Sequence, residues 1–203
     1  MRAVVHDRYG PPEVLRVAEV ERPVPQDDEL LVRVAASTVT RGDAMGVRSR
    51  EYLFTRLFTG VRRPRRTGFG TEFAGTVEEV GAAVTGLLPG DEVFGTSAAA
   101  TAEYVAVPES GVIVEKPQAL TFEEAAAIPD GSLLALTCLR AAEPLRGKHV
   151  LVYGAAGSVG TAAVQLLGGH FEAEVTAVCD TKDVELEQRP VLLDRLLELV
   201  RRV

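Results

Sequence analysis

The sequence has no tryptophan and only two cysteines, two methionines and three histidines in 203 residues. Two thiols cannot build a four-thiolate zinc site or a disulfide-rich scaffold. Cys138 and Cys179 are therefore expected to be buried, reduced thiols, with a single disulfide as the alternative. The histidines His6, His149 and His170 show no paired spacing. We expect each of them to be a structural or surface residue, and we expect no bound metal.

Basic residues are also in the minority, since 22 Lys and Arg stand against 29 Asp and Glu for a net charge of −7. A nucleic-acid partner needs a net basic face, so this function class is excluded. No segment offers the roughly 18 consecutive apolar residues of a membrane span, and the first residues lack the apolar core of a signal peptide. We therefore expect a cytoplasmic protein without a membrane partner. The arginine-rich stretch 62–66 is expected to be a solvated loop.

The first 115 residues are instead rich in short, valine-containing runs separated by Pro and Gly turn signals. Short strands at this spacing predict a compact barrel or sandwich. The predicted strands are Arg2–Val5, Leu15–Val20, Leu30–Ala36, Gly75–Val80, Glu92–Phe94, Ala102–Val107 and Val112–Glu115.

The pattern becomes mixed helix and strand after Leu120. Thr121 and Glu124 have the spacing of a capping box, which opens a helix. The run His149–Tyr153 is typical of a strand that is buried on both faces in a parallel sheet. Val191–Val203 carries leucines at helical spacing, which favours a core helix or an oligomer contact. Further elements are predicted as helices over Ser132–Ala142 and Thr161–Leu167 and a strand over Glu174–Cys179.

Three glycines, Gly154, Gly157 and Gly160, lie between the first of these strands and the helix that follows. In a strand-turn-helix-strand frame, such glycines allow a sharp turn, backbone approach to a pyrophosphate and close packing of the helix on the sheet. The helix N-terminus then offers free N–H groups to the phosphate. We predict a dinucleotide site made by these glycines with Ser158 and Val159. The alternative is a tight turn without a ligand.

Several ordered blocks resemble the medium-chain dehydrogenase/reductase superfamily, in its zinc-free quinone oxidoreductase-like branch, nearly continuously from residue 1 to about residue 186. The resemblance implies a mixed α/β fold, with a GroES-like β-barrel domain over 1–118 and a shortened Rossmann-type βαβα segment over 119–203. It also implies a substrate cleft between the two. The blocks that carry it are Tyr9–Leu15, Gly70–Val77, Pro89–Gly95, Ala102–Val105, Leu120–Ala126 and Val152–Gly160.

Zinc-dependent relatives carry a cysteine where this chain has Thr40, a histidine at Thr71 and a further cysteine near Asp130. Asp43 and Glu72 match carboxylate positions of the family, but hydroxyls do not replace thiolate and imidazole on zinc. The resemblance therefore implies no metal. Thr40 is the candidate catalytic residue, because it stands where zinc-free relatives carry an Asn that could donate a hydrogen bond to a developing oxyanion. The alternative is a β-branched residue that fills the end of a strand.

The resemblance also implies a nicotinamide cofactor. A carboxylate at the end of the second strand would bind the ribose 2′-hydroxyl, whereas a basic residue there would accept a 2′-phosphate. Cys179 takes the usual acidic position, and Thr181 and Lys182 follow, which favours NADP over NAD. Asp180 opposes this preference, because it carries the wrong charge for a phosphate. We predict NADP, because Cys179 leaves the acidic position uncharged and the basic Lys182 follows.

The expected function is a zinc-independent NAD(P)H-linked oxidoreductase that reduces a quinone, an enone or a related small-molecule carbonyl. The stretch from Gly147 to Val203 is too short for a six-stranded Rossmann domain, because each parallel crossover takes a dozen or more residues. A two-stranded parallel remnant exposes its edges, so we expect a homodimer. The alternative functions are a shortened relative without hydride transfer, serving as a binding module or a cofactor-independent enzyme, and a deletion product.

Overall fold

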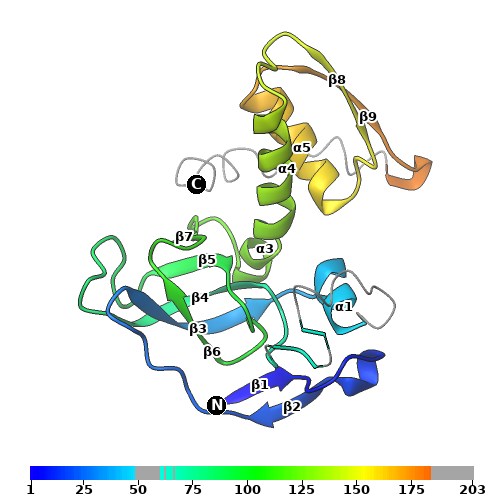
Figure 1. Cartoon of the computed structure of the whole chain (residues 1–203). Helices are drawn as coiled ribbons and strands as arrows, with labels where there is room; N and C mark the ends of the chain where they lie inside the picture. Colours follow the sequence, from blue (N-terminus) through cyan, green and yellow to red (C-terminus); the bar gives the residue numbers. More distant parts are fainter. Residues whose placement is uncertain (49–59, 62, 66, 184–203) are drawn as a thin grey trace. The chain divides into compact units, whose positions relative to one another are not determined.

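The computed structural model describes residues 1–48, 60, 61, 63–65 and 67–183 of the chain. Within it, the chain divides into two compact units, Met1–Ala127 and Ile128–Val203 (Figure 1). The domain boundary predicted after residue 118 stays a prediction. No helix in the described part of the chain has the length and hydropathy that a bilayer-spanning segment needs.

The first unit is built on a five-stranded antiparallel sheet with the strand order β6-β3-β4-β5-β7 (Figure 1). The separate antiparallel pair β1-β2 is joined to this unit's loops by isolated bridges from Ala3 to Ala102 and from Val5 to Gly68. The strands are β1 (Arg2–Val5), β2 (Arg16–Glu19), β3 (Glu29–Ser37), β4 (Glu72–Val80), β5 (Glu92–Thr96), β6 (Tyr104–Pro108) and β7 (Ile113–Glu115). All seven overlap the strands that the valine-rich runs predict.

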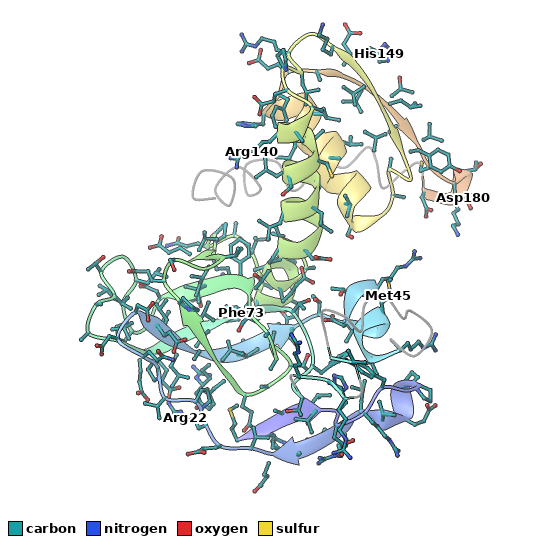
Figure 2. The ribbon with its side chains drawn as sticks, in the orientation of Figure 1. Arg22, Met45, Phe73, Arg140, His149 and Asp180 are labelled. Atoms are coloured by element: carbon teal, nitrogen blue, oxygen red, sulfur yellow. The ribbon has the colours of Figure 1, made fainter. Side chains whose placement is uncertain are left out.

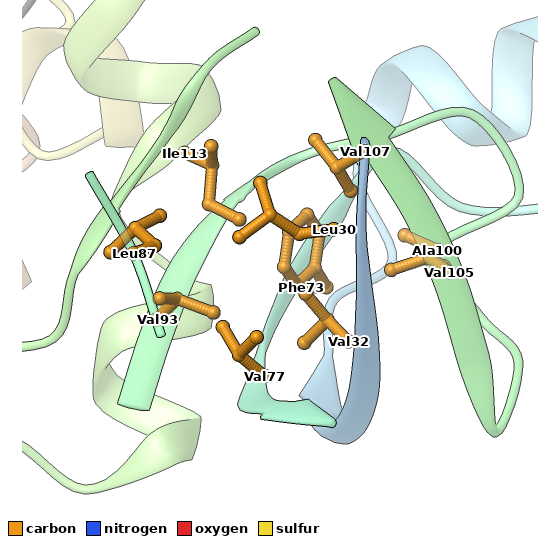
Figure 3. Packing of buried hydrophobic residues seen from close by; sticks show 10 residues of the cluster. All are labelled: Leu30, Val32, Phe73, Val77, Leu87, Val93, Ala100, Val105, Val107 and Ile113. Carbon is orange, nitrogen blue, oxygen red and sulfur yellow. The ribbon is translucent and has the colours of Figure 1, made fainter. Parts of the chain in front are cut away.

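The hydrophobic core of this unit lies on the central strands of the sheet. Phe73 and Val32 are fully buried on neighbouring strands, and Val93 from β5 is buried as well. Figure 3 shows the Phe73 ring among aliphatic side chains that come from the adjacent strands. The ten residues of this cluster are Leu30, Val32, Phe73, Val77, Leu87, Val93, Ala100, Val105, Val107 and Ile113. Burial of these side chains holds the loops at the ends of β3 and β4 in place.

Short helices follow three of these strands, β1, β3 and β7. The 3-10 helix η1 (Pro12–Val14) precedes β2, α1 (Arg41–Val47) follows β3, and α3 (Phe122–Ala126) contacts β3, β4 and β5. The predicted capping box is confirmed, because Glu124 N–H donates to Thr121 Oγ1 at 3.2 Å and Thr121 N–H donates to the Glu124 carboxylate at 3.0 Å.

The second unit contains two helices and a two-stranded parallel sheet. Helix α4 (Pro129–Ala141) packs against α5 (Ser158–Gly169), and β8 (His149–Tyr153) pairs with β9 (Glu174–Val178). The helices approach closely, since a Cβ atom on Gly131 would lie 2.8 Å from the backbone of Ser158. The 3-10 helix η2 (Thr181–Asp183) follows β9. This is the βαβ order that the sequence predicts.

The prediction that β8 is buried on both faces is wrong. Its residues alternate between exposed and half-buried, and the side chains of Leu151 and Tyr153 are 66% and 87% exposed. Figure 2 shows the row of side chains on this sheet, with His149 at the start of β8 and Asp180 beyond the end of β9. Helix α5 contacts both strands, and an apolar run becomes buried on both faces only where a second layer covers the other side.

The cysteine prediction holds only in part. Cys138 and Cys179 form no disulfide with each other, but Cys138 is exposed and Cys179 is half-buried. The expectation that both are buried is therefore wrong. The predicted helix over Val191–Val203 lies outside the described residues, as do Arg62 and Arg66 of the arginine-rich stretch.

Candidate functional site

A hydrogen-bond network centred on the buried Asp43 joins it to Thr40 and Thr71 at the start of α1. The Thr40 N–H donates to Asp43 Oδ2 at 2.8 Å, and the Asp43 N–H donates to Thr40 Oγ1 at 3.1 Å, so the two residues form a capping box. The Thr40 hydroxyl donates to Asp43 Oδ2 at 3.0 Å, and the Thr71 hydroxyl donates to Asp43 Oδ1 at 3.2 Å. The Asp43 carboxylate is 7% exposed. It therefore holds α1 against the start of β4.

This network determines what the predicted catalytic residue can do. A hydroxyl has one proton to donate, and that of Thr40 is already directed at the Asp43 carboxylate. Thr40 thus serves as the helix N-cap rather than as a side chain that fills a strand end. To hydrogen-bond a substrate oxygen, its hydroxyl would first have to rotate away from Asp43.

A second buried carboxylate lies next to this network. Glu72 is 3% exposed and accepts a hydrogen bond from the Thr38 hydroxyl. At four positions that the resemblance matches to the zinc-dependent family pattern, the chain thus carries two hydroxyls, Thr40 and Thr71, and two carboxylates, Asp43 and Glu72. Among the residues that the structure describes, no cluster of three or more His, Cys, Asp or Glu side chains could hold a metal ion.

A cavity of about 490 Å³ opens beside the network, wholly within the first unit. Asp43 and Thr71 line it on one side, and His6 from the end of β1 lines it as well. His6 is 7% exposed. The remaining lining residues are small, apolar or at the opening: Tyr9, Gly42, Gly46, Val47, Pro64, Arg65, Gly68, Phe69, Gly70, Ala98 and Ala99.

In the second unit, the glycine turn has the geometry that the sequence predicts. Gly154 has a φ of +77°, a left-handed conformation that favours glycine, and its N–H donates to Val178 O at 2.9 Å. Gly157 is the N-cap of α5, and Ser158 and Val159 are its first residues. A Cβ atom on Gly160 would lie 2.3 Å from Gly154 O, so the helix packs on the turn only because this residue is glycine.

The residues predicted to choose between NADP and NAD lie at the same end of the parallel sheet. Thr181 and Lys182 form η2 just after β9, and the turn at Gly154 bonds to the last residue of that strand. Lys182 Nζ is 3.8 Å from Asp180 Oδ2, and both side chains are exposed. The ammonium group thus already faces a carboxylate, which competes with a phosphate for it.

Seven of the eight predicted site residues therefore lie together in the second unit, and Thr40 lies in the first. Sequence reasoning missed the cavity and the buried His6. The lining comes from four segments that are distant in the chain, so no local pattern could have identified it. The Thr40–Asp43 capping box did have a signal, because an acidic residue three positions after a threonine has the right spacing.

Comparison with known proteins places this arrangement in a family. Residues 26–118 match the family model described as the alcohol dehydrogenase GroES-like domain. The chain is 34% identical over 202 residues to a quinone oxidoreductase from Lama guanicoe, covering 95% of this chain and 56% of the relative. It is 33% identical over 198 residues to a 2-methylene-furan-3-one reductase from Solanum lycopersicum, covering 92% of this chain and 49% of the relative.

Among solved structures, the Escherichia coli quinone oxidoreductase complexed with NADPH is similar, with a TM-score of 0.75 and 25% sequence identity. The match covers 92% of this chain and 55% of that one. The chain thus spans about half the length of the relatives that it matches. It combines a GroES-like domain with part of a Rossmann-like sheet. The chain belongs to the medium-chain dehydrogenase/reductase superfamily, in its quinone oxidoreductase-like branch.

Proposed function

We propose that this chain belongs to an NAD(P)H-linked oxidoreductase that reduces a quinone or an enone without zinc. The proposal rests on how closely Gly160 packs against the turn. A Cβ atom added to Gly160 would lie 2.3 Å from the carbonyl oxygen of Gly154. A β-strand, a left-handed glycine and a helix packed this tightly form the cradle that receives a pyrophosphate in dinucleotide-binding folds.

The chain's own groups fit such a pyrophosphate. The first N–H groups of a helix have no acceptor within the helix, and in α5 these belong to Ser158, Val159 and Gly160. Together with the positive end of the helix dipole they favour an anion. Gly157 has no side chain that would cap these N–H groups, and Ser158 and Val159 are exposed at the turn. A bound NAD(P)H would supply a hydride equivalent at its nicotinamide.

The substrate class is inferred from the relatives. Proteins similar to this chain are named for quinones, for alkenals and enones, and for a furanone. Reduction of these substrates adds a hydride to an activated carbon and places negative charge on oxygen, so the protein's task is to orient the substrate and to stabilise that oxygen. Thr40 would assist with its hydroxyl after rotating from Asp43, and it remains our candidate catalytic residue.

We infer that NADPH is preferred to NADH. Cys179 leaves the usual acidic position without a charge, and Lys182 is exposed within reach of this end of the sheet. A structure in the same family is complexed with NADPH. Asp180 opposes the preference by pairing with Lys182. The variant Lys182→Ala is expected to lower NADPH affinity and to leave NADH affinity unchanged.

The test is a calorimetric titration of NADPH into the purified chain and two glycine variants of the same helix. Gly160→Ala adds a methyl group that would overlap the turn, and it is expected to abolish NADPH binding. Gly168→Ala is the matched control, because a Cβ atom there meets nothing within 4 Å. It should bind NADPH like the original chain. Absence of NADPH binding at millimolar concentration in the original chain would remove the oxidoreductase proposal.

We also propose that the chain forms a homodimer through the exposed face of β8 and β9. Leu151 and Tyr153 present apolar surface there, and strand edges with such faces pair readily. Light scattering after size exclusion should show a dimer at micromolar concentration, and the double variant Leu151→Thr with Tyr153→Thr should be monomeric. A monomer for the original chain contradicts this proposal.

A second candidate function is a binding module without hydride transfer. The cavity that contains His6, Asp43 and Thr71 lies within the first unit and needs no residue of the second. NADPH binding without NADPH consumption over a panel of quinones and enones would favour this candidate.

A further inference from the structure

The cavity of the first unit contains a buried imidazole that the proposed reaction does not use. His6 is 7% exposed, and its Nδ1 lies 3.3 Å from the carbonyl oxygen of Arg8. A carbonyl oxygen only accepts hydrogen bonds, so Nδ1 carries a proton, and in the neutral ring Nε2 is then a bare lone pair. Within the described part of the chain it has no hydrogen-bond partner.

The Asp43 carboxylate gives the same cavity a second acceptor. Its Oδ2 receives both the N–H and the hydroxyl of Thr40, whereas its Oδ1 receives only the Thr71 hydroxyl. A carboxylate oxygen accepts two hydrogen bonds, so Oδ1 keeps one position open. The hydroxyl protons of Thr71 and Tyr9 do not alter this balance, because they are directed at Asp43 and at the carbonyl oxygen of Gly60.

The rest of the lining sets the size and polarity of a ligand. Four glycines and the side chains of Phe69 and Val47 leave a space of about 490 Å³ with mostly apolar walls. This volume is in the range of small-molecule sites. Arg65 also lines the cavity, and its residue is exposed. The buried polar groups that a ligand would meet are therefore His6 and Asp43, and both accept hydrogen bonds.

We propose that this cavity binds the hydroxyl form of a quinone-type ring, that is a hydroquinone or a related phenol, with one hydroxyl donating to His6 Nε2. The carbonyl oxygens of an oxidised quinone would face two acceptors, so neither His6 Nε2 nor the open position on Asp43 Oδ1 would gain a partner, which costs binding energy. A hydroquinone supplies the protons that both acceptors need. His6 is thus a specificity-determining residue that distinguishes the reduced ring from the oxidised one. The choice of a quinone-type ring rests on the proposed function.

The test compares durohydroquinone, kept reduced under anaerobic conditions, with duroquinone, which has the same carbon skeleton. The titration uses the full chain without cofactor. We expect durohydroquinone to bind about 5- to 10-fold more tightly than duroquinone, as one additional hydrogen bond predicts. Equal affinities, a preference for duroquinone or no binding of either ring would overturn the proposal.

Two substitutions of His6 isolate Nε2. His6→Asn keeps an amide N–H near the position of Nδ1, so it retains the contact with Arg8 and loses the second acceptor. His6→Gln carries its amide oxygen at about the position of Nε2. We expect the preference for durohydroquinone to disappear in His6→Asn and to persist in His6→Gln. If His6→Asn keeps the preference for durohydroquinone, His6 does not distinguish the reduced ring from the oxidised one.

A measurement on the unaltered chain covers the case in which a variant fails to fold. A long-range ¹H–¹⁵N spectrum of the imidazoles should show His6 protonated at Nδ1, and durohydroquinone alone should shift its Nε2 resonance. A His6 protonated at Nε2 contradicts the proposal. These readouts are independent of NADPH, so failure of the cofactor titration and failure here are separate results.

Discussion

The two sheets of this protein differ in how far the chain buries its own apolar strands. In the first unit, β4 is buried along most of its length, and Phe73 is fully inaccessible. In the second unit, β8 is the more apolar strand in sequence, yet Leu151 is 66% exposed. An apolar run therefore indicates a strand that can be buried. Whether it is buried depends on a second layer that the run itself does not encode.

The largest effect on the free energy of unfolding is expected when a large side chain in each sheet is truncated and the two losses are compared. Phe73→Ala removes a ring from the closed core shown in Figure 3, and it should lower the free energy of unfolding by about 3–5 kcal/mol. Leu151→Ala removes a side chain that is exposed in the single chain, so at a protein concentration where the chain is monomeric it should change that free energy by no more than about 0.5 kcal/mol. Urea unfolding followed by circular dichroism measures both. A large loss for Leu151→Ala would mean that another surface covers β8.

An intermediate effect is expected from two aspartates in contrasting surroundings. Asp43→Ala removes the buried acceptor of the Thr40 N–H and the Thr71 hydroxyl, so it should cost about 1–3 kcal/mol. Asp180→Ala in the second unit removes only an exposed, 3.8 Å contact with Lys182. Its effect on unfolding should be close to zero. Similar losses for the two variants would show that the network at α1 does not stabilise the first unit.

The sequence predicts the strands and helices well because their signals are local. Valine-rich runs bounded by Pro and Gly gave each strand of the first unit, and Thr121 with Glu124 identified the start of a helix. The glycine turn was also predictable, because a left-handed φ at Gly154 and the close packing at Gly160 both favour glycine. The capping box of Thr40 and Asp43 has the same spacing as the confirmed one and could have been predicted from it.

Properties that depend on distant parts of the chain were not predictable. The burial of β8 was wrongly predicted, because the covering layer is not part of the strand's pattern. The role of Asp43 depends on Thr71, which lies 28 residues further along. The cavity of His6 requires β1, α1 and two loops to converge, and no spacing in the sequence reports such convergence.

The smallest effect is expected from a surface ion pair of the first unit. The Arg2 N–H donates to Glu103 Oε2 at 2.8 Å, and Arg2 Nε donates to Oε1 at 2.8 Å. These hydrogen bonds, first the backbone one and then the side-chain one, hold the pKa of Glu103 below its ordinary value. Because the folded pKa is the lower one, the stabilisation is present above the unfolded carboxyl pKa and is lost as pH falls through the folded pKa.

Arg2→Ala removes only one of the two contacts, since the backbone N–H remains. The pKa of Glu103, followed by the ¹³C shift of its carboxyl in an NMR titration, should therefore rise part of the way towards its ordinary value. Because both side chains are exposed, we expect the stability at neutral pH to change very little. A complete return of the pKa in Arg2→Ala would mean that the side chain alone sets it. In that case β1 and the loop before β6 would be linked here only by a surface charge contact. The stability of the first unit would then depend on its apolar core and its buried carboxylates.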